Sequence, residues 1–286
     1  MKEKNRTEKG TLYLVGTPIG NLADMSERAI KILSEVDFIA AEDTRNSLRL
    51  LTHLGIRKTM ISYFEHNKQE RGEQIVAKLK DGESGALITD AGMPAISDPG
   101  EDLVRLCAEN GVPVTTVPGP CAAITALTLS ALPTGRFTFE GFLSANKSER
   151  RASLSELQNE KRTMIFHEAP HKLKATLADM KSAFGDNRKI ALCRELTKLN
   201  EQVIRMTLSE AVKYYEENEP RGEFVIVVDG ATSSSSEAFW ESMTIPEHVG
   251  FYIDGGMSKN DAIKAAAKDR KLPKNDIYKQ VLSIKS

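Results

Sequence analysis

Two clusters of charged residues follow predicted strands, at places where side chains could hold a substrate or move a proton. They are Glu42, Asp43 and Arg45 in the first half of the chain, and Glu195 and Lys198 in the second. A carboxylate beside an arginine or a lysine at the rim of a cleft can bind a substrate or take part in proton transfer. The alternative is that both clusters are ion networks that join two domains at their rims.

Three loops rich in glycine and proline also follow predicted strands, at residues 16–21, 90–94 and 118–120. In parallel α/β sheets, ligands bind beyond the carboxyl ends of the strands. Glycine lets a ligand approach the backbone closely, and proline fixes the shape of a loop before binding. Ordinary turns between strands and helices use the same residue types. The three loops therefore leave two alternatives, a ligand site or a set of structural turns.

The sequence lacks the common nucleotide motifs, because no GxGxxG follows the first predicted strand and GxxxxGK[ST] does not occur in the chain. Residues 167–171 (HEAPH) have the letters of the zinc motif HExxH, which requires both histidines on one helix. Here a predicted strand end and a proline separate His167 from His171, which argues against a shared metal ion. We therefore expect no P-loop, no dinucleotide fingerprint and no metal site.

The elements that must position these residues alternate between strand and helix. Over residues 11–130, strands are predicted at 11–15, 38–41, 60–63, 86–89 and 112–117. Helices are predicted between and after them, near 26–36, 47–54, 74–80, 99–110 and 121–129. This alternation predicts an α/β domain with a mostly parallel sheet.

A second α/β unit follows the first. Its strands are predicted at 137–142, 163–167, 190–194, 203–206 and 223–228, with a charged helix at 148–160. Thr207 and Glu210 form a capping-box pattern that starts another helix. Several of these strands follow one another without a helix between them, which favours a mixed sheet.

We expect four segments in the chain. They are 1–130 and 131–230 as the two α/β domains, 231–243 as a serine-rich flexible linker, and 244–286 as a small helical module. In the module, Ser258 and Asp261 are predicted to cap one helix, Pro273 breaks it, and 275–284 forms another. That pattern resembles a helix-turn-helix.

Composition limits the classes of protein that fit. Apolar residues make up 40% of the 286 and charged residues 28%, as in folded globular proteins. The longest strongly apolar run, 224–228, is far shorter than the ~20 residues of a membrane helix, and the charged N-terminus is not typical of a secretory signal. Cys107, Cys121 and Cys193 form no CxxC pair, which favours a reducing cytoplasm over a disulfide framework.

The formal net charge of −1 does not predict a polyanionic partner, so such a partner would need a local basic patch. Over 146–174, seven Lys and Arg stand against four Glu; over 256–286, eight stand against three Asp. Each local excess suits contact with RNA phosphates. The alternative is that both are solvated charged surfaces.

Five segments, taken in order, resemble one family. They are residues 10–22 (GTLYLVGTPIGNL), 40–45 (AAEDTR), 97–100 (SDPG), 117–125 (VPGPCAAIT) and 194–198 (RELTK). They resemble ribosomal RNA small subunit methyltransferase I, a family in the tetrapyrrole methylase superfamily of S-adenosylmethionine-dependent enzymes. The resemblance covers nearly the whole chain. One position departs from the pattern, because Met93 stands where the family commonly has threonine.

The resemblance implies two α/β domains with the methyl donor in the cleft between them. It implies S-adenosylmethionine as cofactor and 2′-O-methylation of a cytidine in the decoding region of small-subunit rRNA, either naked or in the assembled subunit. A homodimer is compatible with it. For donor binding it points to strand-end loops and one interdomain strand, at Pro18, Asp90, Ala91, Gly92, Met93, Cys121, Ala122 and Phe166.

The charged clusters fit the acceptor side of this reaction. Methyl transfer to a hydroxyl requires in-line positioning and benefits from a base or from stabilisation of the developing alkoxide. The candidates are Lys198, neutral or as a cation, and Glu195, Glu42 and Asp43, with Arg45 beside them. Two alternative functions stay open: methylation of a tetrapyrrole or another small molecule, and a non-catalytic role in ribosome assembly.

Overall fold

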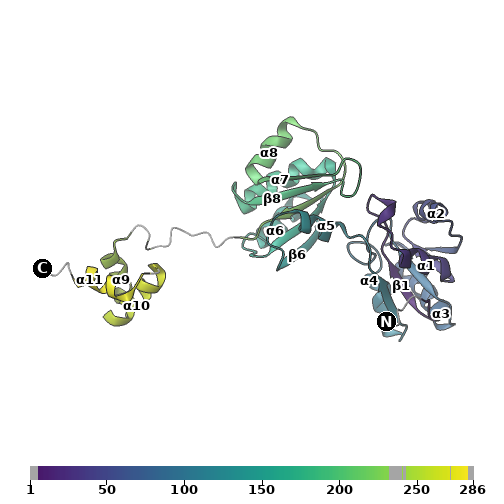
Figure 1. Ribbon diagram of the computed structural model, residues 1–286, viewed down its shortest axis with the longest axis horizontal. Helices are drawn as coiled ribbons and strands as arrows, with labels where there is room; N and C mark the ends of the chain where they lie inside the picture. Colours follow the sequence, from purple (N-terminus) through teal and green to yellow (C-terminus); the bar gives the residue numbers. More distant parts are fainter. Residues whose placement is uncertain (1–5, 232–239, 241–242, 271, 283–286) are drawn as a thin grey trace. The chain divides into compact units, whose positions relative to one another are not determined.

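The computed structural model describes residues 6–231, 240, 243–270 and 272–282. The chain divides into two compact units, Met1–Gly230 (unit 1) and Ala231–Ser286 (unit 2). Unit 1 contains two five-stranded sheets, and the described part of unit 2 is helical (Figure 1). The serine run predicted as a linker, 233–236, lies outside the described residues.

The first sheet of unit 1 is parallel throughout, with strand order β3-β2-β4-β1-β5. Its strands are β1 (Leu12–Val15), β2 (Phe38–Ala41), β3 (Thr59–Ser62), β4 (Gly85–Ile88) and β5 (Val114–Val117). Between them lie η1 (Leu22–Asp24), α1 (Glu27–Glu35), α2 (Thr44–His53), α3 (Lys68–Lys80) and α4 (Glu101–Glu109). The predicted parallel α/β arrangement is confirmed.

Helices cover both faces of this sheet. Tyr13 and Val15 belong to a core cluster with buried residues of α1 and α2, whereas Leu12 belongs to a second cluster with α3 and α4. Successive strand residues point to opposite faces, so the central strands β1, β2 and β4 are buried on both sides. Glycine-rich loops follow the carboxyl ends of β1 and β4.

The second sheet is mixed, as predicted, with strand order β6-β7-β10-β8-β9. β6 runs parallel to β7, while β10 is antiparallel to both of its neighbours. Its strands are β6 (Phe137–Phe142), β7 (Thr163–Glu168), β8 (Lys189–Arg194), β9 (Gln202–Thr207) and β10 (Phe224–Val228). The helices are α5 (Ala122–Leu129), α6 (Lys147–Glu156), α7 (Pro170–Phe184) and α8 (Leu208–Glu217).

Helix α5 lies on the second sheet, where it contacts β7 and β10. Its residues Ala123 and Ala126 share a core cluster with Ile165 and Val225 of those strands. The opposite face of the sheet is covered by α6, α7 and α8. The domain boundary predicted after residue 130 stays a prediction. Helix α5 lies before this boundary in the chain, yet it packs against the second sheet, which lies after it.

Helix α7 is not among the predicted elements, although the sequence contains a helical pattern there. Leu173, Leu177 and Met180 are buried and recur at helical spacing on the face toward the core. Pro170 occupies the first turn, where proline is tolerated, and Gly185 follows the last turn with a positive φ. These terminal residues would have marked both ends of the helix.

Unit 2 contains α9 (Ile245–Asp254), α10 (Lys259–Arg270) and α11 (Lys274–Leu282) around its own apolar core. The pair α10 and α11 matches the predicted helix-turn-helix-like pattern, and α9 adds a helix started by a Thr244–Glu247 capping box. Arg270 joins the helices, because its Nε donates to Nδ1 of His248 and its Nη2 to the Trp240 carbonyl. Within the described parts of the chain, no helix is long and apolar enough to cross a membrane.

Candidate active site

A cavity of about 470 Å³ lies between the strand ends of the two sheets in unit 1. Six of the predicted donor-binding residues line it, namely Asp90, Ala91, Gly92, Met93, Cys121 and Ala122. Ile19 also lines it, and Pro18 precedes Ile19 in the chain. Phe166 is different: its ring is fully buried in the core on the α7 side of the second sheet, so only its backbone can serve a ligand.

The loops of the first sheet hold one another in place. Thr17 and Gly92 exchange backbone hydrogen bonds of 2.9 and 3.1 Å, and the Thr17 hydroxyl donates to the Thr89 carbonyl. A Cβ on Gly16 would lie 2.8 Å from Cα of Gly119 and 2.7 Å from Sδ of Met93. Glycine is therefore required at position 16, where the three loops meet and form one side of the cavity.

Three carboxyl groups gather at the first sheet's side of the cavity. Asp90 and Asp98 line it, and Glu42 lies close enough to influence Asp98. Burial raises the pKa of Asp98 to about 6, with help from Glu42 and Asp90. Burial likewise raises the pKa of Glu42, with Asp90 and Asp43 adding to it. The Asn46 amide steadies Asp90 by donating to its Oδ2 at 3.0 Å.

Asp98 lines the cavity but is not among the site residues predicted from the sequence, where it only forms part of the segment 97–100. Its segment is conformationally unusual, since Ala95 and Ser97 both have positive φ. Non-glycine residues rarely adopt this conformation, and they do so often at functional sites. The only signal in the sequence that could have pointed to Asp98 is the pair Pro99 and Gly100 directly after it.

Asp43 and Arg45 serve the start of helix α2. Oδ1 of Asp43 accepts a hydrogen bond of 2.8 Å from the Arg45 backbone, as an N-cap does. The Arg45 side chain pairs with the Asp43 carboxylate at 3.1 Å and is 89% exposed. That contact lowers the pKa of Asp43 below its ordinary value. Capping and ion pairing thus explain these two side chains structurally, and their part in catalysis stays a prediction, whereas Glu42 interacts with Asp90 and Asp98 of the cavity wall.

Lys198 bridges two carboxylates beside the cavity. Its Nζ lies 3.0 Å from Oε1 of Glu195 and 2.9 Å from Oε2 of Glu223, which lines the cavity. Burial alone would lower the pKa of Lys198, but Glu223 and Glu195 outweigh it and raise the pKa. This raised pKa favours the cationic form of Lys198 at neutral pH over the neutral form. A Cβ on Gly20 would lie 2.4 Å from Cγ of Lys198, so the first loop is packed against this cluster.

His167 and Glu168 end β7 and line the cavity from the second sheet. The His167 ring makes edge contacts with Phe139 and Phe142, with centroids 5.2 and 5.3 Å away. Its Nε2 is buried and has no hydrogen-bond partner among the described residues. Burial lowers the pKa of His167, so the ring is neutral at pH 7 and free to hydrogen-bond a ligand.

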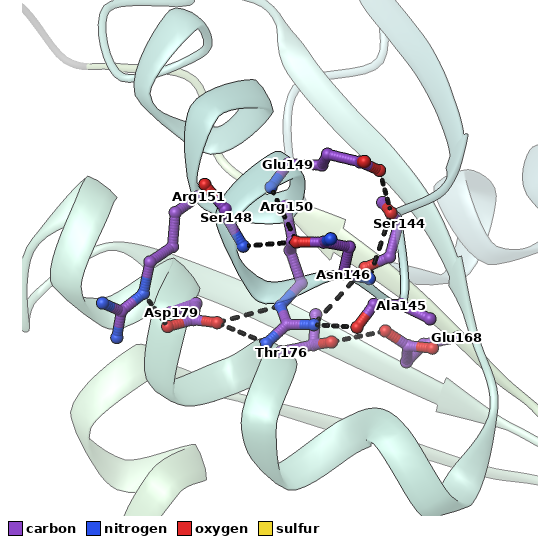
Figure 2. Close-up of polar contacts among 10 residues, drawn as sticks. All are labelled: Ser144, Ala145, Asn146, Ser148, Glu149, Arg150, Arg151, Glu168, Thr176 and Asp179. Carbon is purple, nitrogen blue, oxygen red and sulfur yellow. Dashed lines mark hydrogen bonds and ion pairs between the residues drawn. The ribbon is translucent and has the colours of Figure 1, made fainter.

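The β6–α6 loop behind this wall is held by a buried arginine (Figure 2). Nε and Nη2 of Arg150 donate to Oδ2 of Asp179 at 2.9 and 2.6 Å, and Nη1 donates to the Ser144 carbonyl. Arg151 pairs with the other oxygen of Asp179. Arg150 is therefore neutralised inside the protein and does not count toward the basic excess at 146–174, while RNA contact by the other six basic residues of that segment stays a prediction.

The cavity thus offers three kinds of contact. Its first wall is acidic and suits a cationic ligand, its second wall combines aromatic and apolar side chains with Glu168 and Glu223, and the Lys198 cation pairs with Glu223 of that wall. Burial raises the pKa of Cys193 to about 11, so this thiol in the wall is not a nucleophile at neutral pH. Across the described residues, no group of three His, Cys, Asp or Glu is arranged to hold a metal ion.

Comparison with known proteins gives concordant matches. Residues 11–212 match the family model for tetrapyrrole (corrin/porphyrin) methylases. The chain is 48% identical to ribosomal RNA small subunit methyltransferase I of Halalkalibacterium halodurans over 96% of each chain. It is 44% identical to the protein of that name from Synechocystis sp., over 97% of this chain and 99% of the relative. The structure of cobalt precorrin-4 methyltransferase covers 77% of this chain and 95% of its own, with a TM-score of 0.57 at 16% identity, which supports the fold.

Proposed function

Because the chain belongs to the tetrapyrrole methylases and, within them, to the ribosomal RNA small subunit methyltransferase I family, we propose that it methylates the 2′-hydroxyl of a cytidine in small-subunit rRNA with S-adenosylmethionine as donor. The observation that carries the proposal is the cavity, which joins an acidic, glycine-lined side to the Lys198 cation. Relatives that share nearly the whole chain favour rRNA over a tetrapyrrole or a non-catalytic role.

The cavity residues fit S-adenosylmethionine, which carries a sulfonium and an ammonium group beside an adenosine. When bound, this donor supplies an electrophilic methyl group. Asp90 would offset the charge of these cationic groups, and Ala91 and Gly92 leave the loop backbone accessible. The remaining contacts come from Met93, Cys121 and Ala122 in the wall, with Pro18 and Phe166 acting through the backbone.

Asp98 is suited to accept the proton of the ribose hydroxyl. It lines the cavity, and its pKa of about 6 makes it a stronger base than an ordinary aspartate while leaving it ionised at neutral pH. Glu42 and Asp90 contribute to that pKa through their negative charges. Glu42 therefore acts through Asp98, as a positioning residue.

Lys198 is suited to stabilise the alkoxide that develops on the ribose oxygen. Its ammonium group is held at the rim by Glu195 and Glu223, so its place is set before substrate binds. A charged lysine cannot act as the base. The division of roles is then a base, Asp98, on one side of the cavity and a cation, Lys198, on the other.

RNA contact falls to basic residues outside the cavity, with the module 244–286 as the main site. Lys264 and Lys268 of α10 are exposed, whereas Arg270 is occupied within the module. Phosphate contacts of this kind give affinity without sequence preference, so the module would hold rRNA while unit 1 selects the nucleotide.

Methyl transfer by the purified full chain tests the proposal. The substrates are methyl-labelled S-adenosylmethionine and either naked small-subunit rRNA or subunits from cells that lack the protein. We expect label at one cytidine, at a linkage that resists alkaline cleavage because its 2′-oxygen is blocked. Label on a base atom, or no label on either substrate, would contradict the proposal.

A further inference from the structure

A second cavity, of about 280 Å³, opens at the same strand ends as the donor cavity but on the other face of the second sheet. Phe224 lines both cavities. Its ring belongs to the core on the α8 side, 6.1 Å from the ring of Tyr215, whereas the next residue, Val225, belongs to the cluster facing α5. The end of β10 therefore separates the two cavities by one strand.

The second cavity is lined by two arginines, two tyrosines and two side-chain amides. Those used below are Arg194, Gln202, Tyr214, Tyr215, Asn218 and Arg221. Glu219 also lines it, but its carboxylate is paired with Lys174 at 2.6 Å. The cavity is thus polar and locally positive, unlike the acidic donor cavity on the other face.

Some of these side chains are held in place and others are free. Arg194 is fixed, since its Nε donates to the Arg221 carbonyl at 2.6 Å and its Nη1 to Oε1 of Gln202. The Arg221 guanidinium, by contrast, has no ion-pair or hydrogen-bond partner within the described part of the chain. The Tyr214 ring is 38% exposed, yet an edge-to-face contact with Tyr215 at 4.9 Å orients it.

We propose that this second cavity binds a nucleotide of the rRNA that flanks the methylated one. Single-stranded RNA is recognised by stacking of unpaired bases on aromatic rings and by arginines at the phosphates. Tyr214 supplies the oriented ring, and Arg221 supplies the free cation. The inference rests on the proposed function, which puts the methylated nucleotide at the first cavity. Because Phe224 lines both cavities, a nucleotide in the second cavity would lie next to the methylated one.

The amides supply the means to read the edge of that base. Asn218 donates through Nδ2 to the Tyr214 carbonyl at 2.8 Å, which leaves its Oδ1 as an acceptor. Gln202 accepts from Arg194 through Oε1, which leaves its amide hydrogens as donors. An acceptor and a donor in one cavity can pair with a base edge, so this subsite would contribute to choosing which cytidine is methylated.

Four variants of the full chain test the subsite: Tyr214→Ala, Tyr214→Phe, Arg221→Ala and, as a control, Lys213→Ala. Lys213 is exposed on α8 and does not line the cavity. Its replacement by alanine therefore removes one positive charge nearby without changing the cavity wall. Tyr214→Ala should raise the KM for rRNA roughly tenfold or more, as loss of a stacked base does, while Tyr214→Phe keeps it near wild type. Arg221→Ala should weaken rRNA binding and reduce its salt slope by roughly one.

Direct measurement of rRNA affinity and of donor affinity separates this inference from the proposed function. Reduced rRNA affinity in Tyr214→Ala and Arg221→Ala, with unchanged donor affinity and an unchanged Lys213→Ala control, supports the subsite. Wild-type rRNA affinity and KM in both variants would overturn it. If the wild-type protein transferred no methyl group but these variants still lost rRNA affinity, the proposed function would fail and the subsite would stand.

Discussion

At the scale of single residues, Asp98 is a carboxyl group of the cavity wall whose pKa is raised both by burial and by neighbouring negative charges. Burial, with Glu42 and Asp90, raises its pKa to about 6, so it changes charge just below neutral pH. A base that must be ionised works only above its pKa. We expect wild-type kcat/KM to rise with pH and to level off above about 6.

Asp98→Asn should lower methyl transfer roughly hundredfold and remove this pH dependence, because the amide cannot accept the proton. Donor affinity should change much less than turnover. The measurement is methyl transfer to rRNA across pH 5 to 9, with exposed Asp81→Asn as the matched control. A wild-type profile in Asp98→Asn would assign the proton to another group.

The same substitution should stabilise the fold at high pH. Folding raises the pKa of Asp98 from 3.8 to about 6, so above pH 6 the folded state carries the cost of a charge that the unfolded state solvates easily. Below about pH 4 the group is protonated in both states and the cost disappears. Asp98→Asn should therefore raise the free energy of unfolding by about 1 kcal/mol at pH 8, discounted for partial exposure, and by nothing at pH 3.

Denaturant unfolding followed by far-UV circular dichroism measures this difference. Fluorescence is unsuitable, since the single tryptophan, Trp240, lies in unit 2. A variant that is less stable than wild type at pH 8 would mean that Asp98 has stabilising partners in the fold. A gain in stability with a loss of activity would mark Asp98 as functional.

Lys198→Met should lower turnover by roughly a hundredfold while leaving donor affinity within a few-fold of wild type. The change removes the cation and leaves Glu195 and Glu223 without their shared partner. Lys198→Arg keeps the charge and should retain more activity. The control is Leu199→Ala, because Leu199 is 99% exposed. Equal turnover in Lys198→Met and Leu199→Ala would reduce the cluster to an ion network at the rim.

At the scale of elements, the side of the cavity proposed to bind the donor depends on how closely three loops approach one another. Gly16→Ala would place a Cβ 2.8 Å from the Gly119 Cα, so the loops must move apart. We expect donor affinity to fall at least tenfold and stability by about 1–3 kcal/mol. Gly135→Ala is the control, since nothing lies within 4 Å of its Cβ. Calorimetry with S-adenosylmethionine gives the comparison, and equal affinity in both variants would show that the loops tolerate separation.

At the scale of the whole molecule, we propose that unit 1 transfers the methyl group and that unit 2 helps to hold the rRNA. Lys264→Ala with Lys268→Ala should weaken rRNA binding and lower its salt slope by roughly one to two, without changing donor affinity or the nucleotide methylated. Both lysines are exposed on α10. The matched control neutralises Lys31 and Lys213 of unit 1. An unchanged salt slope in the α10 variant would remove the module from RNA binding.

The sequence by itself determined most elements and the family, because both are written in local patterns. Ser26 and Thr207 cap the helices that they were predicted to start, and the strand at 38–41 has the predicted bounds. Capping and apolar alternation involve neighbours in the chain, so they can be recognised without a fold. Loops such as 90–94 pointed to the cavity for the same reason.

Only the tertiary structure decided what the charged side chains do. It placed Asp98 beside Glu42, paired Lys198 with Glu223, and buried Arg150 against Asp179. Each of these partners is distant in the sequence, and the pKa of a group depends on burial and on charges within a few ångströms. Such distances are set by the packing of sheets and helices, which is why a count of charges misplaced Arg150 and overlooked Asp98.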